Sequence, residues 1–528
     1  MNQSNQKGGI LMFTKRRFII IIASVVVLSL AVGGLLGRGV FAIRDNIYEN
    51  LRSFSQVLTL IQEHYVTEVQ PKKLIFAAIK GMISSLDPYS QFLEPQDMRD
   101  LRVSTQGRFG GLGIQIGIRD NVLTVISPMF GTPAYKAGIQ AGDRIVKIEG
   151  KSTKGITTDE AVKKLRGEPG TQVTITIQRE GVSELMDYTI TRAIIQIDCI
   201  PYYGLLNNRI GYIELVNFSE KAGPDIAQAI DELEKEKIQS LILDLRYNSG
   251  GLLNEAVEVA SNFIDQDSVI VSTKGREPQQ NRVFRSLKSP LYGKYPLIVL
   301  VNEGSASASE IVAGAIQDWD RGLVLGQRTF GKGSVQSVIP LPDSLGLKLT
   351  VAKYYTPSNR CIHRDVPEED TTALEDTTKS KEIFYTVGKF HRNVYGGGGI
   401  APDIVLESPQ MGKLAQDLVR KGLFFKFAVK YTVTHKPAQD FEVNAEMLEE
   451  FKRLLSEEKV SYELPEFKES ETDIKTQIKR EILAKLYGEK AMLRFFIDND
   501  PWVKKAIELL KVNKTAEALL KAGMAEAK

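Results

Sequence analysis

At 528 residues the chain exceeds one ordinary domain, and about 150 residues per domain predicts three or four. Its 43% hydrophobic and 25% charged residues are typical of a globular protein with a large core. The net charge of +3, without a strong basic block, argues against a nucleic-acid-binding protein. Cys199 and Cys361 are too few for a metal cluster; they could form one disulfide, but we expect reduced thiols.

The N-terminus predicts a membrane segment. Lys15, Arg16 and Arg17 precede an uncharged run at 18–37, which matches the about 20 residues that a spanning helix needs. The basic flank should stay in the cytoplasm. We predict a cytoplasmic tail and uncleaved signal anchor over 1–44, single-pass in the inner (cytoplasmic) membrane, with the rest of the chain in the periplasm or extracytoplasmic space. A cleaved signal peptide and a buried soluble helix are the alternatives.

Residues 45–104 are predicted to be a helical region. Apolar residues recur there at helical spacing from Ile47 to Ile61, and a second helix begins at Pro71. From 105 to 188 the pattern changes to short β runs with glycine turns and one helix, "TTDEAVKKLRG". We therefore predict a separate β-rich module inserted after the helical region.

This module, from "FGGLGIQIGI" to "RIVKIEGKS", resembles a PDZ domain of the bacterial protease type. The N–H groups of a glycine turn before an edge strand can receive the C-terminal carboxylate of a peptide, which then extends the sheet. The apolar side chains of this turn favour an apolar last residue. Arg166, at the end of the helix, is a candidate sensor of bound peptide, although most such arginines are only solvated. The turn that we expect to bind peptide consists of Gly111, Leu112, Gly113 and Ile114. A glycine turn without a ligand is the alternative.

From 189 to 408 strands and helices alternate, and the strands are almost continuously apolar, as in "SLILDLR" and "PLIVLVN". Such strands predict an α/β core whose sheet is covered on both faces. The acidic, Thr-rich segment 366–382 is predicted to be a mobile loop. From 409 to 528 the chain is predicted to form charged amphipathic helices.

Within the core, "VNEGSASASE" places Ser305, Ser307 and Ser309 at alternate positions before a helix that starts near Ala308. Free N–H groups and the positive end of the helix dipole favour a developing anion there. Ser307 with Glu310 also fits a capping box, so this stretch alone leaves both interpretations open.

Two further turns could complete a catalytic site. In "GQRTFGKGSVQ", Lys332 lies between two glycines; a solvated lysine is the usual case, and a lysine becomes a base only if burial leaves it neutral. Gln336 follows four residues later, where even spacing could bring its amide to the same face. In "LDLRYNSGGLLNEAV", Gly250 and Gly251 expose N–H groups that suit an oxyanion hole, with a plain glycine connection as the alternative.

The usual serine activators are missing from the sequence. None of the four histidines lies in a turn that resembles a catalytic one, no G-x-S-x-G occurs, and no S-x-x-K starts at any of the three serines. A serine and a lysine contributed by separate loops is the remaining variant of the triad.

The segment from "VNEGSASASE" to "FGKGSVQ", with "DLRYNSGG", "LTVAKYYTPSNR" and "GGGGIAPDI", resembles the carboxyl-terminal (tail-specific) processing proteases, the S41 serine peptidases, over about 50–405. The resemblance implies a crotonase-like α/β core. It leaves the role of Asp318 open, and "SNRCIHR" departs from the usual family wording in what we take to be a peripheral loop. The implied site residues are Ser307 as nucleophile, Lys332 as base, Gln336 as its orienting partner, and the N–H groups of Gly251 and Ala308 as oxyanion donors.

The resemblance implies a membrane-anchored, extracytoplasmic serine endopeptidase that recognises protein tails with apolar C-termini and needs no metal or other cofactor. The alternative is a catalytically inactive PDZ scaffold or adaptor, although the joint presence of Ser307, Lys332 and Gln336 argues against it. Amphipathic flanks at 45–104 and 409–528 could support a homodimer.

Overall fold

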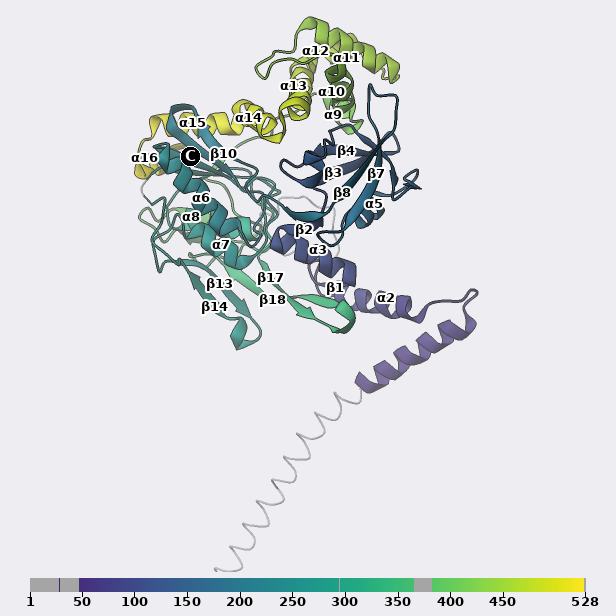
Figure 1. The fold of residues 1–528 in the computed structure, drawn as a ribbon. Helices are drawn as coiled ribbons and strands as arrows, with labels where there is room; N and C mark the ends of the chain where they lie inside the picture. The colour runs from purple at the N-terminus through teal and green to yellow at the C-terminus, as the bar shows by residue number, and fades with distance from the viewer. Residues whose placement is uncertain (1–27, 29–46, 294, 365–381, 527–528) are drawn as a thin grey trace, which may run out of the picture. The chain divides into compact units, whose positions relative to one another are not determined.

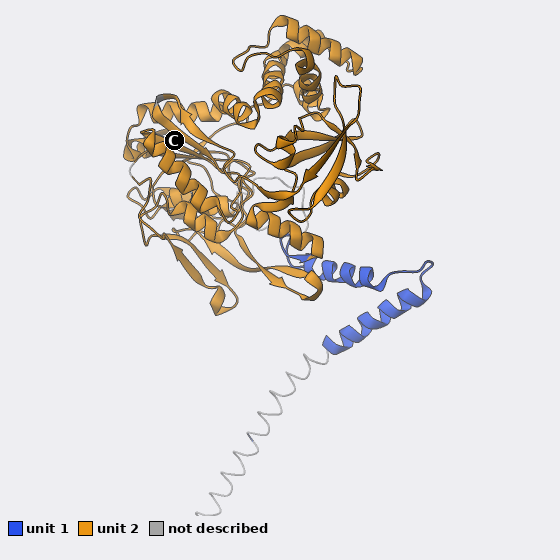
Figure 2. Ribbon diagram, viewed as in Figure 1, with its two compact units in different colours: residues 1–92 blue, residues 93–528 orange. Residues whose placement is uncertain are grey.

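The computed structural model describes residues 28, 47–293, 295–364 and 382–526. The chain divides into two compact units, residues 1–92 and 93–528 (Figure 2). Within the described ranges, no helix is both long and apolar enough to cross a membrane. The predicted membrane segment, 18–37, lies outside them except for Leu28, and so does the predicted acidic loop, 366–382, except for Glu382.

The first unit contains the two helices that its periodicity predicts. One covers residues 47–64, and α2 covers Pro71–Ser84 (Figure 1). Proline at the first helical position suits α2 because its fixed φ matches a helix and no N–H bond is lost there. Strand β1 (Gln91–Leu93) runs across the boundary into the second unit, which continues with α3 (Pro95–Gln106).

The predicted β module is present. Strand β2 (Arg108–Gly111) pairs with β9 (Ala193–Gln196), and a larger antiparallel sheet has the order β3-β4-β5-β7-β8 with β6 beside β5. Strand β3 is an edge strand of this sheet, as predicted. Inward-facing residues such as Val125, Ile145 and Ile175 form a separate core. The remaining elements are β3 (Ile114–Arg119), β4 (Val122–Pro128), α4 (Pro133–Lys136), β5 (Arg144–Ile148), β6 (Lys151–Ser152), α5 (Thr158–Leu165), β7 (Gln172–Gln178) and β8 (Met186–Thr191).

The core sheet has the order β10-β11-β12-β15-β16-β21 and is parallel from β11 onward. Side chains alternate across a strand, so Leu241 and Leu243 pack with the helices of one face while Ile242 packs with those of the other. The prediction of a sheet covered on both faces is confirmed. Its strands are β10 (Tyr202–Leu206), β11 (Ile210–Glu214), β12 (Ser240–Asp244), β15 (Leu297–Val301), β16 (Leu323–Gly326) and β21 (Ile404–Val405).

Helices from different parts of the chain cover these faces. Helices α6 (Ala222–Lys235), α7 (Leu253–Ala260) and α8 (Ala308–Asp318) pack on the first face. The second face is covered by α15 (Pro501–Val512) and α16 (Ala516–Glu526). The C-terminal helical region is therefore not only a flank, because part of it completes the core.

A second antiparallel sheet carries the segment after the lysine turn. Strand β17 pairs with β18, β18 with β13, and β13 with β14. Its bounds are β13 (Val269–Gly275), β14 (Arg282–Arg285), β17 (Ser334–Pro340) and β18 (Gly346–Tyr355), and a short pair is formed by β19 (Ile383–Tyr385) and β20 (Asn393–Tyr395). Short 3-10 turns are η1 (Asn207–Arg209), η2 (Pro278–Gln280) and η3 (Pro342–Ser344).

The remaining C-terminal helices form a small core of their own, in which Phe424, Phe427 and Phe451 pack together. Their bounds are α9 (Lys413–Arg420), α10 (Leu423–Thr434), α11 (Ala445–Glu457), α12 (Leu464–Glu469) and α13 (Glu471–Tyr487), with α14 (Glu489–Asn499) leading back to the core sheet. The helical prediction for this region is confirmed over its described residues.

Candidate active site

The three serines of the turn between β15 and α8 have different environments. Ser305 and Ser309 are fully buried, and their hydroxyls donate to the carbonyls of Leu245 and Asn248, each at 2.8 Å. Ser307 is half-buried, and the capping box with Glu310 that the sequence allowed is present, although the Ser307 hydroxyl accepts no close hydrogen bond from the helix. Its φ of 55° and ψ of −111° are strained for a residue with a side chain, and such strain clusters at functional sites.

Glu310 joins the serine turn to the lysine turn. Its Oε2 accepts the backbone N–H of Ser307 at 2.8 Å and that of Lys332 at 2.9 Å. The two backbone nitrogens are therefore no farther apart than the sum of these distances. Its Oε1 accepts the hydroxyl of Thr329 at 2.5 Å and the N–H of Gly331 at 2.8 Å. Besides its place in the predicted capping box, Glu310 therefore also positions the second turn.

The Glu310 carboxyl is fully buried, and this burial raises its pKa above the ordinary value, although the four hydrogen bonds oppose the shift. An ionised carboxylate only accepts hydrogen bonds, so it matches four donors that all point toward it. The arrangement therefore depends on a carboxylate, and an amide of the same shape would present an N–H group to another donor.

The lysine turn packs closely against the segment that follows β18. A Cβ on Gly333 would lie 2.7 Å from the backbone nitrogen of His363, so only glycine fits there. The N–H of Arg364 donates to the carbonyl of Gly331 at 2.9 Å. The expectation that "SNRCIHR" belongs to a peripheral loop is wrong, because this segment supports the turn that carries Lys332.

The Lys332 side chain is half-buried, and β17 begins two residues after it. Gln336 is half-buried on this strand, and its amide donates to the hydroxyls of Ser334 and Thr350 at 2.9 and 3.2 Å. The fold therefore fixes the orientation of the Gln336 amide through two hydroxyls that the sequence did not single out.

The glycine loop after β12 packs directly on the serine turn. The N–H of Ala306 donates to the carbonyl of Asn248 at 3.0 Å. A Cβ on Gly250 would lie 2.8 Å from Ser307 Cβ and 2.9 Å from the nitrogen of Ala308. Among the described residues, neither the N–H of Gly251 nor that of Ala308 has a hydrogen-bond acceptor. The two predicted oxyanion donors thus come from backbone segments in contact with each other, and both are available.

Substituting Gly250 with alanine should lower kcat/KM at least about 100-fold, because the new methyl group would displace Ser307 and the Ala308 amide. The backbone φ of 103° adds strain of about 1–3 kcal/mol. Steady-state cleavage assays and thermal unfolding measure the two effects. Gly488→Ala is the control, since Gly488 also has a positive φ of 83° but nothing within 4 Å of its Cβ position. Equal loss of activity in both variants would contradict the explanation by contact.

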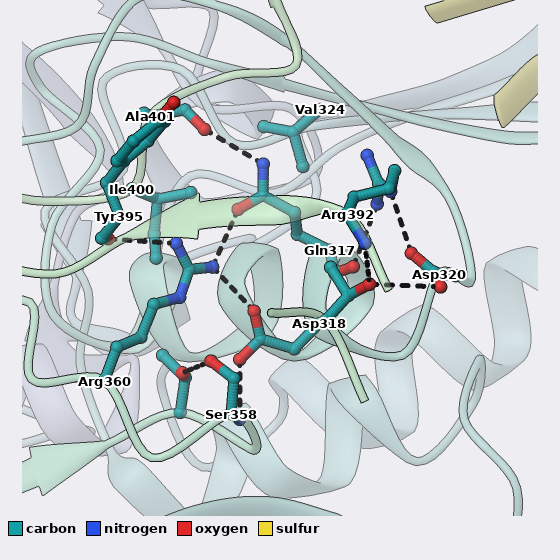
Figure 3. A network of polar contacts seen from close by, with 12 residues as sticks. Gln317, Asp318, Asp320, Val324, Ser358, Arg360, Arg392, Tyr395, Ile400 and Ala401 are labelled. Atoms are coloured by element: carbon teal, nitrogen blue, oxygen red, sulfur yellow. Dashed lines mark hydrogen bonds and ion pairs between the residues drawn. The ribbon is translucent and has the colours of Figure 1, made fainter. Parts of the chain in front are cut away.

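A buried ionic network holds the opposite end of α8 (Figure 3). Asp318, whose role the sequence left open, accepts from the guanidinium of Arg360 at 2.7 Å, and both side chains are fully buried. Asp318 also accepts the N–H of Ser358 at 2.9 Å. Because Arg360 lies in the segment that supports the lysine turn, this pair fixes that segment to α8, which starts directly after Ser307.

The predicted peptide-binding turn of the β module directs its carbonyls inward. The carbonyl of Leu112 accepts from Ala134 at 3.0 Å, and that of Gly113 accepts from Met129 at 2.9 Å. The N–H groups of Leu112 and Gly113 have no acceptor among the described residues. The side chain of Leu112 is only 2% exposed, so the turn can bind a ligand through its backbone amides and not through this side chain. Gly111 precedes the turn as the last residue of β2, and half-buried Ile114 follows it.

Arg166 follows α5 and contacts elements outside the sheet of the β module. Its guanidinium stacks on Phe109 with Cζ 4.4 Å from the ring centroid, and Nη1 lies 3.4 Å from Asp100 Oδ1 on α3. The side chain stays 35% exposed. A peptide carboxylate that reached Arg166 would therefore compete with Asp100.

Family profiles match most of the chain. Peptidase family S41 matches residues 209–372 and the PDZ domain 124–179, while the N-terminal domain of the activating protease CtpB matches 41–96. A probable PDZ-protease C-terminal helical domain matches 414–466 and 464–510. A carboxy-terminal-processing protease of Bartonella bacilliformis is 41% identical over 369 residues, which cover 69% of this chain and 77% of that protein. The chain belongs to peptidase family S41.

This S41 protein is a serine-type peptidase that carries a PDZ domain, in the group of the carboxy-terminal processing proteases. CtpA of Bacillus subtilis is 36% identical over 354 residues, or 66% of this chain and 74% of that protein. Among solved structures, a photosystem II D1 C-terminal processing protease is 29% identical and covers 67% of this chain and 92% of its own, with a TM-score of 0.36. The resemblance drawn from the sequence is confirmed.

Sequence reasoning missed one support of the nucleophile candidate. The hydroxyl of Tyr354 on β18 donates to the carbonyl of Ser307 at 3.0 Å, and this tyrosine is 1% exposed. Tyr354 lies 47 residues from Ser307 in the chain, within an ordinary aromatic strand. Nothing in the sequence therefore indicated this contact. With Glu310 holding the N–H of Ser307, the strained backbone of that residue is fixed from both sides.

Proposed function

We propose that this S41 peptidase cleaves peptide bonds with a Ser307–Lys332 dyad. The observation that carries the proposal is the shared Glu310 carboxylate, which brings the serine and lysine turns together beside two unused N–H groups. Neutral Lys332 takes the proton from the Ser307 hydroxyl while the Oγ attacks the peptide carbonyl carbon. The oxyanion is held by the N–H groups of Gly251 and Ala308, and Gln336 orients the lysine.

The second half of the reaction returns the enzyme to its starting state. The proton on Lys332 passes to the leaving amine as the C–N bond breaks, which leaves an acyl ester on Ser307. Lys332 then takes a proton from water, whose oxygen attacks the ester, and finally returns a proton to Ser307. These reaction steps use no cofactor.

The PDZ domain selects protein substrates by their C-terminal tails in this proposal. The free amides of Leu112 and Gly113 bind the terminal carboxylate, the peptide pairs with the β3 edge, and Ile114 favours an apolar last side chain. Arg166 leaves Asp100 when a tail is bound.

The test of this function compares one unfolded protein substrate with two tails. A tail ending in an apolar residue should be cleaved with a kcat/KM at least about tenfold above that of the same protein ending in two aspartates, because a charge next to the apolar side chain of Ile114 would lose hydration without gaining a partner. Mass spectrometry of the products locates the cleaved bond. Equal rates for the two tails would contradict the proposal that the PDZ domain selects substrates by their tails, but would not contradict the Ser307–Lys332 dyad. The alternative, an inactive PDZ scaffold, predicts binding of the apolar tail without any cleavage.

We further propose that residues 18–37 anchor the protein in the inner membrane with its catalytic core on the extracytoplasmic side. The support is the apolar run behind Lys15, Arg16 and Arg17. Deleting residues 1–44 should release the chain from membranes, and external protease should reach the core only after the outer permeability barrier is opened. A full-length chain that fractionates as soluble protein would contradict this placement.

The helix at 47–64 is proposed as a homodimer contact. Its apolar side chains are 45–57% exposed at Ile47, Leu51, Phe54 and Val57. An exposed apolar stripe of this kind marks an interaction surface, and a second copy is its simplest occupant. Leu51→Glu with Phe54→Glu should convert a dimer to a monomer in light scattering, and an unchanged mass would disprove the contact.

A further inference from the structure

A cavity of about 220 Å³ lies between the PDZ domain and helices α9 and α10. Direct contacts between these parts surround it. On α10, Lys426 Nζ lies 2.9 Å from Asp120 Oδ2 of the PDZ domain, and a Cβ on Gly142 would lie 2.6 Å from Val429 Cγ2. The cavity is thus bounded by two parts of the chain that pack on each other.

The lining of the cavity is strongly cationic. Only two carboxylates, Asp120 and Glu180, line it. Against them stand six cationic side chains, which leaves a surplus of four positive charges: Arg119, Arg144, Arg420, Lys421, Lys426 and Lys430. Such a concentration of one sign in a recess focuses the field and raises the local concentration of anions.

Part of this charge is neutralised by the protein itself. Lys426 pairs with Asp120 and with Glu458, the latter at 2.8 Å, and Lys430 pairs with Glu457 at 3.0 Å. Arg420 pairs with a carboxylate on its own helix, Asp417. The other three cations, Arg119, Arg144 and Lys421, are therefore the candidates for binding a ligand.

Arg144 and Lys421 form no ion pair or side-chain hydrogen bond within the described part of the chain, and Arg119 forms none either, although it interacts electrostatically with the partly buried carboxyl of Glu481. Arg144 is half-buried on β5, where a guanidinium partly removed from water gains most from a counter-ion. Arg119 ends β3, and its Nε lies 3.5 Å from the Cβ position of Gly422, the residue after Lys421. These three cations therefore line the cavity from both sides of the junction between the PDZ domain and α9.

We propose that this cavity binds a compact phosphate-bearing anion. Guanidinium groups match phosphate oxygens with two parallel hydrogen bonds, and two of the unpaired cations are arginines. The volume is below the roughly 300–1,000 Å³ of ordinary ligand pockets, which favours a small multivalent anion over a peptide segment. Because its partners come from both sides, a bound anion stabilises the contact between the PDZ domain and the helical region.

The test titrates the full-length protein, in an uncharged detergent, with inorganic diphosphate in a calorimeter. Arg144→Gln and Lys421→Gln should each weaken binding at least about tenfold, because each removes a charged hydrogen-bond donor from one side of the cavity. Lys154→Gln is the control: it removes the same charge from an exposed position of the PDZ domain that does not line this cavity. Thermal unfolding without ligand verifies that all three variants are folded.

A parallel titration with glycerophosphoglycerol, the soluble headgroup of an anionic lipid, separates two sources of the same chemistry. Binding of both probes at the cavity would indicate a lipid headgroup, and binding of diphosphate alone a free phosphate compound. The proposal is overturned if the wild-type protein binds no diphosphate, or if Lys154→Gln weakens binding as much as the cavity variants. Binding of a glutamate-rich peptide without diphosphate would also overturn it.

Discussion

Replacing Ser307 by alanine should lower kcat by about 10⁴- to 10⁶-fold while leaving KM for a tail-bearing substrate almost unchanged. The hydroxyl is the proposed attacking group, and its loss leaves the peptide-binding turn of the PDZ domain unchanged. Lys332→Ala should cause a loss of similar size, and the double variant should be no worse than either one, because two groups that act in one step are not additive. Product formation under single-turnover conditions measures all three variants.

Ser305→Ala and Ser309→Ala are the matched controls within the same turn. Each removes a buried hydroxyl that donates to a backbone carbonyl at 2.8 Å, so each should cost about 1 kcal/mol of stability. Neither should abolish cleavage. If one of these variants were inactive while Ser307→Ala still cleaved the substrate, the nucleophile would be assigned to the wrong serine.

Replacing Glu310 by glutamine should lower kcat by about 10²- to 10³-fold, with little change in KM. The amide would present an N–H group toward donors that now bind a carboxylate, so the serine and lysine turns would separate. A loss of geometry on the scale of 1 Å reduces rates by about this factor. Stability should also fall by about 1–3 kcal/mol, because buried donors lose their acceptor.

A control separates the effect on position from the effect on stability. Asp320→Asn disturbs another buried carboxylate, which accepts from Arg392 at 2.8 Å and from the N–H of Phe390 at 2.7 Å. Unfolding in urea should show a comparable loss for both variants, but only Glu310→Gln should lose kcat at a temperature where both are folded. Equal loss of kcat would mean that Glu310 has only a structural role.

The sequence was sufficient for the architecture and for the turns that carry the candidate site. Apolar strands between amphipathic helices predicted the covered sheet, and the spacing of glycines around Lys332 predicted a turn with close packing. Both depend on local patterns, because burial on one or two faces and the lack of a Cβ leave direct marks in the chain.

What the sequence could not provide was the partnership between distant segments. Glu310 fits a capping box by itself, and nothing in its neighbours indicates that it also binds the turn at 329–332. Arg360 looks like one residue of a loop until the fold brings it to Asp318. Such contacts are set by the crossing of elements in space, which single-sequence periodicity does not encode.

The shared carboxylate has a consequence for the motions of the site. The amides of Ser307, Gly331 and Lys332 all donate to Glu310, so none can be exposed to solvent unless that side chain releases it. Hydrogen–deuterium exchange should therefore show these three amides opening with one common free energy, although Ser307 is far from the other two residues in the chain. Ser307 and Lys332 would then reach or leave their catalytic positions in the same step. The protease would therefore change between active and inactive states without an intermediate in which only one of the two residues is in place.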